Sequence, residues 1–189
     1  MQPVEVFRPA LTKLVGVLRH IGIRFHLTGG ITAVAYGEPR MTQDLDLVID
    51  AAATMRHRDE LLAALIEAGF YLEQSTARAA IDGKRMFQIL DIEEALKLDL
   101  YLEHSIPGEL DRSVTAEVLP GLALPIAARS DAALSKLIWA SKGSHKSRRD
   151  LRRILERATS EDTTLVRRGA AERNLLGLLD EILREPDLE

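Results

Sequence analysis

The sequence predicts an α/β (α+β) fold, in which a small mixed β-sheet with flanking helices is followed by a C-terminal helical bundle. Residues 44–50 and 95–103 alternate, with leucine or isoleucine at every second position and mostly polar residues between them. This period of two is typical of a strand that buries one face. Apolar residues at helical spacing surround these stretches and dominate the last third of the chain.

Length and composition exclude several classes of protein. The chain has 189 residues, of which 46% are hydrophobic, enough for one domain with or without a helical extension. Its formal charge of −4 is typical of neither a general nucleic-acid binder nor a disordered acidic tail. The absence of cysteine excludes disulfides and thiolate chemistry. Without a signal-like N-terminus or a membrane-length apolar run, we expect a cytoplasmic protein with no membrane partner.

The first elements follow one another closely. Leucines and isoleucines at helical spacing predict a helix over 8–21, and Gly22 is its expected end. A strand over 23–28, the Gly29-Gly30 turn and a short helix to about Tyr36 come next. The Gly-Glu-Pro sequence after Tyr36 ends that helix and leads into the acidic strand.

The middle of the chain predicts a helix and further strands. Residues 56–69 form a helical pattern, and a strand begins at Phe70. Asp82-Gly83 is a hairpin-type signal, so we expect 84–90 to run antiparallel to the segment before it. The Gly/Pro cluster over 120–125 predicts a boundary between a first domain, 1–119, and a C-terminal helical subdomain, 120–189. Helices are expected there from 130 or 131 to about 140, from near 147, and over 163–184 as one helix or a pair.

Three aspartates are candidate metal ligands. Asp44 and Asp46 lie on one face of a predicted strand, about 7 Å apart at Cα, so their carboxylates can converge on one or two hard cations. Asp99 is a third carboxylate in the middle of a strand, where aspartate has a poor intrinsic propensity. A solvated strand face explains any one of these residues, whereas their combination favours a metal site.

Gly29 and Gly30 are candidate phosphate ligands. They lie between an apolar strand and a helix, where glycine permits a close approach to the backbone and the helix N-terminus favours an anion. Taken alone, the pair is typical of any strand-to-helix connection. Together with the aspartates, it predicts a phosphate site beside a metal site.

Basic residues are concentrated between 134 and 158. This segment carries a net charge of +6, so the rest of the chain carries −10. Such a segment in an acidic protein indicates a polyanionic partner, or alternatively an exposed helix face. Arg149, Arg152, Arg153 and Arg157 recur at three- and four-residue spacing, which predicts one exposed row. The basic residues are Lys136, Lys142, Lys146, Arg148, Arg149, Arg152, Arg153 and Arg157.

These motifs resemble the nucleotidyltransferase superfamily, whose signature is a Gly-Gly pair, an Asp-x-Asp strand and a later strand aspartate. More narrowly, the chain is similar to AbiEii-type nucleotidyltransferases, the toxins of bacterial toxin–antitoxin systems. The resemblance covers roughly residues 23–155. Its motifs are Thr28-Gly29-Gly30, residues 40–46, Lys97-Leu98-Asp99-Leu100, Lys136-Leu137 and residues 148–151.

The resemblance implies a nucleotidyltransferase-type sheet and transfer of a nucleotide from an NTP to an acceptor hydroxyl. Such chemistry uses two divalent ions roughly 3.5–4 Å apart, here Mg²⁺ or alternatively Mn²⁺. Asp44 and Asp46 would be shared between the ions, and Asp99 would bind the ion that activates the acceptor. The implied nucleotide-binding residues are Thr28, Gly29 and Gly30 for the triphosphate, with Lys136, Arg40 and Arg148 for its charge.

The acceptor and the biological role follow less directly. The resemblance implies a toxin with a separate antitoxin protein, and tRNA, other RNA or a protein as acceptor. The basic segment favours RNA. One alternative is an antibiotic nucleotidyltransferase with an aminoglycoside-type acceptor, which is polycationic and suits an acidic cleft. A second is a non-catalytic interaction protein on the same fold.

Overall fold

The computed structural model describes residues 4–36, 44–102 and 105–186. The chain divides into two compact units. The first comprises Met1–Ile31 and Met41–Ala127, and the second comprises Thr32–Arg40 and Ala128–Glu189. The division at Ala127 lies after the sequence-predicted boundary at residue 119.

The described residues of the first unit form a seven-stranded mixed sheet in the order β3-β4-β5-β2-β1-β7-β6. β2 runs parallel to β5 and antiparallel to β1, while β4 is antiparallel to both of its neighbours, β3 and β5. The strands are β1 Phe25–Leu27, β2 Asp44–Ile49, β3 Phe70–Tyr71, β4 Phe87–Asp91, β5 Leu96–Tyr101, β6 Val114–Leu119 and β7 Leu122–Ile126. The predicted mixed sheet with flanking helices is confirmed.

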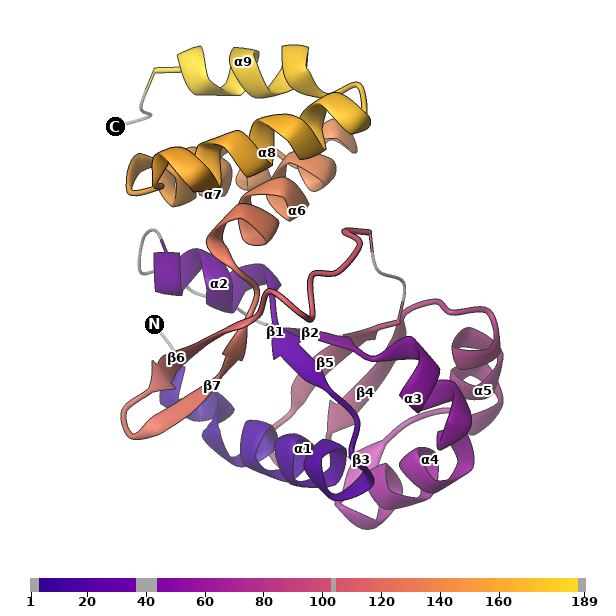
Figure 1. The fold of residues 1–189 in the computed structure, drawn as a ribbon. Coiled ribbons are helices and arrows are strands. Elements are labelled where there is room, and N and C mark those ends of the chain that lie inside the picture. The colour runs from indigo at the N-terminus through magenta and orange to yellow at the C-terminus, as the bar shows by residue number, and fades with distance from the viewer. Residues whose placement is uncertain (1–3, 37–43, 103–104, 187–189) are drawn as a thin grey trace. The chain divides into compact units, whose positions relative to one another are not determined.

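The N-terminal helix has the predicted bounds. After a short 3-10 helix, η1 Val4–Phe7, α1 Arg8–Ile21 begins with proline in its first turn and ends at Gly22, whose φ of 79° gives a left-handed cap. It packs against α4 Arg58–Glu67 (Figure 1). Its apolar stripe is buried and comprises Ala10, Leu11, Leu14, Val15, Leu18 and Ile21.

The segment after β2 differs from the sequence prediction. Asp50 does not continue the strand: its carboxylate caps α3 Ala51–Arg56 by accepting from the Ala53 N–H at 2.9 Å. The helical region therefore starts before residue 56 and is interrupted at His57, which separates α3 from α4.

The predicted hairpin at Asp82-Gly83 is wrong, because a helix, α5 Gln74–Asp82, precedes it. The Glu73 carboxylate caps this helix, and Ala77, Ala80 and Ile81 form its buried stripe. Gly83 is its C-cap. β4 nevertheless runs antiparallel to β3, with α5 as the connection.

The cluster over 120–125 does not begin a wholly helical region. Pro120-Gly121 instead joins β6 and β7 in an antiparallel hairpin, and Leu27 of β1 pairs with Ile126 of β7. Pro125 interrupts the strand pattern in the sequence, yet it lies within β7 opposite Thr115 of β6, and the pairing of β7 with β1 involves Ile126 and not Pro125.

The second unit is helical after Ala127. It contains α6 Arg129–Ser141, α7 His145–Glu156, α8 Ser160–Glu172 and α9 Leu176–Arg184, and α6 packs against each of the others. α2 Gly29–Tyr36 begins in the first unit and continues into the second (Figure 1). In the part of the chain that the structure covers, none of the helices has the length and apolarity needed to cross a membrane.

The Glu73 cap makes the stability of α5 dependent on pH. Hydrogen bonds from Thr76 and Ser75 lower the pKa of Glu73 from 4.5 to about 2. The charged cap therefore stabilises the fold above pH 4.5, and this contribution is lost as the pH falls towards 2. We expect Glu73→Ala to lower the Tm at neutral pH, with a difference from wild type that shrinks between pH 4.5 and 2. A difference that stays constant across this range of thermal melts would refute the role of Glu73 as a charged cap.

Candidate functional site

The parallel pairing of β2 and β5 brings the predicted carboxylates to one face of the sheet. Asp46 lies directly opposite Asp99, and Asp44 lies opposite Lys97. Paired residues of neighbouring strands point to the same side, so the three carboxylates share what we call the polar face. The opposite face buries Leu45, Leu47, Leu98 and Leu100 completely. The polar face comprises Asp44, Asp46, Gln88, Lys97, Asp99 and Tyr101.

Gly29 lies directly against Asp46. A Cβ placed on Gly29 would stand 1.9 Å from Oδ2 of Asp46, and its φ of +63° is left-handed. Both features require glycine at this position. The Thr28 N–H donates to the Asp46 carbonyl at 2.9 Å, which fixes the turn beside the acidic strand. Because α2 begins at Gly29, its N-terminus, which also includes Gly30, lies next to the carboxylates.

Asp99 is the most enclosed of the three aspartates, with 6% of its surface exposed. Gln88 Nε2 donates to its Oδ1 at 2.8 Å, and Lys97 Nζ lies 3.3 Å from its Oδ2. Lys97 Nζ is also 3.7 Å from Oδ2 of Asp44. Burial lowers the pKa of Lys97, but its hydrogen bond to Asp99 and the charges of the three aspartates outweigh this effect and raise it overall.

Asp46 is held by a tyrosine of the neighbouring strand. Tyr101 donates its hydroxyl to Oδ1 of Asp46 at 3.3 Å. Burial, together with the negative charges of Asp46 and Asp99, raises the pKa of Tyr101 well above its usual value. Tyr101 is therefore a hydrogen-bond donor throughout the physiological pH range, not a base.

The three carboxylates have the oxygen donors that a hard divalent cation prefers, but their present side-chain conformations do not converge on one point. Within residues 4–36, 44–102 and 105–186, no three His, Asp or Glu side chains are close enough to form a metal-binding group. The carboxylates point instead to Lys97, Tyr101 and Gln88. Carboxylate oxygens are the preferred ligands of Mg²⁺, and all three lie on one face of two paired strands, so the type and placement of the donors fit such a cation.

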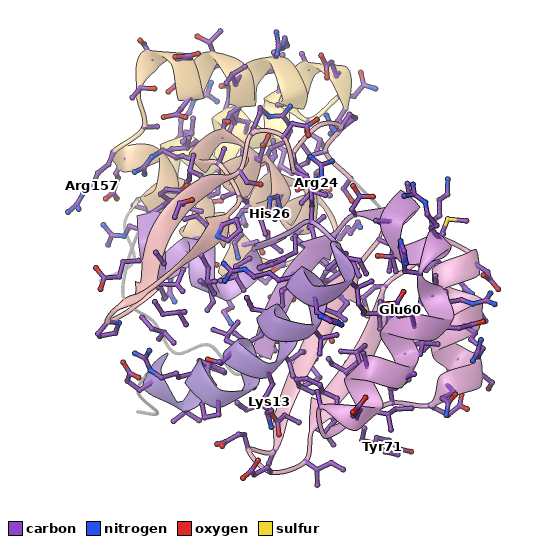
Figure 2. The ribbon with its side chains drawn as sticks, turned by 60° about the horizontal axis from the view of Figure 1, so that its bottom comes forward. Lys13, Arg24, His26, Glu60, Tyr71 and Arg157 are labelled. Carbon is purple, nitrogen blue, oxygen red and sulfur yellow. The ribbon has the colours of Figure 1, made fainter. Side chains whose placement is uncertain are left out.

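A buried histidine lies on the same side of the sheet. His26 is completely buried, and its Nδ1 is 2.8 Å from Ser113 Oγ (Figure 2). Its Nε2 is 3.5 Å from Oε2 of Glu109, which is also buried. These contacts attach the segment over 105–113 to β1, a structural role that no sequence motif indicated.

Comparison with known proteins decides the family. The model of the family described as "Nucleotidyl transferase AbiEii toxin, Type IV TA system" matches residues 14–187. The chain belongs to the AbiEii family. The predicted family and nucleotidyltransferase fold are thereby confirmed, whereas none of the curated proteins matches the sequence significantly.

Two solved structures have the same fold as this AbiEii chain. The antibiotic-resistance factor ANT(2'')-Ia is 16% identical, with a TM-score of 0.60, and the match covers 94% of this chain and 95% of the other. An antigenic nucleotidyltransferase-like protein from Paracoccidioides brasiliensis is 17% identical, with a TM-score of 0.52 and coverages of 93% and 92%. At these identities the similarity concerns the fold alone.

The remaining predicted nucleotide ligands of the AbiEii chain are Arg40, Lys136 and Arg148. Arg40 is outside the described residues. Lys136 belongs to the second unit, where its buried Nζ lies 2.9 Å from Oδ2 of Asp150. Arg148, also in the second unit, forms ion pairs with Glu181 and Glu185. Both residues therefore have acidic partners on neighbouring helices.

Arg152 is not part of an exposed row, and that prediction is corrected. It is 8% exposed, and it donates to the Pro186 carbonyl at 2.7 Å and to the Glu185 carbonyl. The exposed side of α7 instead carries basic residues at spacings of three and four, and Arg157 projects outward from the helices (Figure 2). This basic row comprises Lys146, Arg149, Arg153 and Arg157, of which Arg153 is half-buried and forms an ion pair with Glu156 at 2.9 Å.

The contact between Gly29 and Asp46 predicts a coupled pair of substitutions. Gly29→Ala should lower the free energy of unfolding by about 1–3 kcal/mol, because the new methyl group overlaps the Asp46 carboxylate. In an Asp46→Ala background the same substitution should cost less, since the overlapping oxygen is gone. Urea denaturation of the four proteins measures this coupling. Additive effects would show that Asp46 does not occupy the space beside Gly29.

Proposed function

We propose that this protein is a metal-dependent nucleotidyltransferase that transfers a nucleotide from an NTP to an acceptor hydroxyl. The observation that carries the proposal is the contact of Gly29 with Asp46, together with the pairing of Asp46 with Asp99. This arrangement puts a helix N-terminus, suited to a phosphate, beside carboxylates suited to divalent cations. Membership of the AbiEii family supports the same chemistry.

Each residue has a proposed role. Asp44 and Asp46 would be shared between the two cations. Asp99 would hold the cation that activates the acceptor hydroxyl, and would receive the proton of that hydroxyl directly or through water. When bound, the two Mg²⁺ ions neutralise the phosphate oxygens and the leaving pyrophosphate. The backbone of Thr28, Gly29 and Gly30 seats the triphosphate. We propose that Lys136, Arg40 and Arg148 neutralise the negative charge of the triphosphate. Lys136 and Arg148 must then release their present acidic partners.

We propose RNA, with tRNA as the first candidate, as the acceptor, and the toxin half of a toxin–antitoxin pair as the biological role. Family membership supports the toxin role. The basic row on α7 supports a polyanionic acceptor, although it is smaller than the sequence indicated because Arg148 and Arg152 bind within the protein. A cytoplasmic location is consistent with such an acceptor.

Transfer is tested with each labelled NTP, Mg²⁺, and total RNA, total protein or an aminoglycoside as acceptor. We expect the label in RNA, and Asp46→Asn should reduce transfer by about a hundred-fold or more, because it removes a metal ligand. Its Tm should not fall, since one negative charge leaves a repulsive cluster.

Label in the aminoglycoside would replace the RNA acceptor with an antibiotic. An absence of label from every acceptor, with no effect of Mg²⁺ and NTP on the Tm, would overturn the proposed function in favour of a non-catalytic interaction protein.

The basic row predicts a salt-dependent phenotype. Replacing Arg149, Arg153 and Arg157 with glutamine should weaken RNA use and flatten the dependence of log affinity on log salt, by about 0.7 for each phosphate group that the variant no longer neutralises. A control variant replaces three other exposed arginines, Arg19, Arg56 and Arg85, with glutamine. Filter binding at several salt concentrations gives the slopes. If both triple variants behave like wild type, the basic row is only a solvated helix face.

A further inference from the structure

Lys97 holds the aspartate that the proposed function assigns to the acceptor. Both carboxylate oxygens of Asp99 are engaged, Oδ1 by Gln88 at 2.8 Å and Oδ2 by Lys97 at 3.3 Å. Asp46 accepts a hydrogen bond from the hydroxyl of Tyr101. A cation that approaches Asp99 therefore meets an ammonium group already in place.

The charges on the polar face show what this ammonium does. Among the described residues of the polar face, Asp44, Asp46 and Asp99 carry three negative charges when ionised, and Lys97 reduces their total to −2. One divalent cation balances that charge, whereas a second would bring a net positive charge into a partly buried cluster. The phosphates of an NTP supply the missing negative charge.

The partial exposure of Lys97 indicates that its ion pairs do not serve mainly to stabilise the fold. Its side chain is 42% exposed, so its ion pairs contribute little to the stability of the fold. Its ion-pair partners are Asp99 on its own strand, β5, and Asp44 on β2, which backbone hydrogen bonds already join to β5. Its position is thus suited to competing with a cation more than to holding the sheet together.

We propose that Lys97 sets the order of metal loading: without nucleotide, Asp44 and Asp46 take one divalent cation while Lys97 keeps Asp99, and the second cation binds only together with the NTP. The inference rests on the proposed function, since it assigns the loading of that same site. It makes Lys97 a positioning residue for Asp99. The advantage is that the carboxylate that activates the acceptor becomes available only when a nucleotide is present to be transferred.

The test counts Mn²⁺ ions per chain by calorimetry, first with Mn²⁺ alone and then with α,β-methylene analogues of the four NTPs. Wild type should bind one Mn²⁺ alone and two with an analogue. Lys97→Gln and Lys97→Met should bind two without nucleotide, or the first about ten-fold more tightly, because the competing charge is gone. Lys97→Arg should keep the wild-type count. Arg19→Gln removes one exposed charge from α1 and should also leave the count unchanged.

Two results would overturn the inference: wild-type counts and affinities in both Lys97→Gln and Lys97→Met, or two Mn²⁺ ions on wild type without nucleotide. Either result leaves the proposed function intact if the wild-type protein transfers nucleotide and Asp46→Asn does not. Failure of wild type itself to transfer nucleotide would instead reject the proposed function. Circular dichroism of each variant confirms that a changed count does not come from misfolding.

Discussion

Burial of leucine on one side of the sheet fixes the site on the other side. Leu45, Leu47, Leu98 and Leu100 are fully buried, and a shift of either strand by one residue would turn them to solvent and turn the aspartates into the core. The pairing of Asp46 with Asp99 is thus enforced by hydrophobic burial, since two like charges side by side oppose it. Lys97, which is paired with Asp99, and the hydroxyl of Tyr101, which donates to Asp46, reduce the repulsion between these two carboxylates.

The strands that carry the site were predictable because the alternation of leucine with polar residues indicates which side chains face the core and which face the site. The pattern around Asp99 indicated that Lys97 and Tyr101 share its face, although it gave neither residue a role. Gln88 was missed for a physical reason: its contact with Asp99 depends on the register of β4 against β5, which no local pattern encodes. The closeness of Gly29 to Asp46 is likewise a property of the β1–β2 pairing.

Turn signals were less informative because they mark where the chain changes direction and not which elements meet there. Asp82-Gly83 suits a hairpin, yet it ends a helix whose start depends on the cap at Glu73. Pro120-Gly121 suits a domain boundary, yet it joins β6 to β7. In both places the deciding information lies in more distant pairing, Tyr71 with Leu90 and Leu27 with Ile126.

The basic segment shows why net charge is a poor measure of a binding surface. Its helices divide the cations by face: Lys136, Arg148 and Arg152 turn inward and find Asp150, Glu181 and Glu185, or backbone carbonyls, while the basic row turns outward. The two glutamates are more than thirty positions from Arg148, so a local charge count cannot include them. The inward cations hold α6, α7 and the C-terminal segment together, because a buried charge without its partner is costly. Recognition of a polyanion by this segment therefore depends on the basic row and on the exposed Lys142, and its strength has to be judged from those side chains and not from the total of +6.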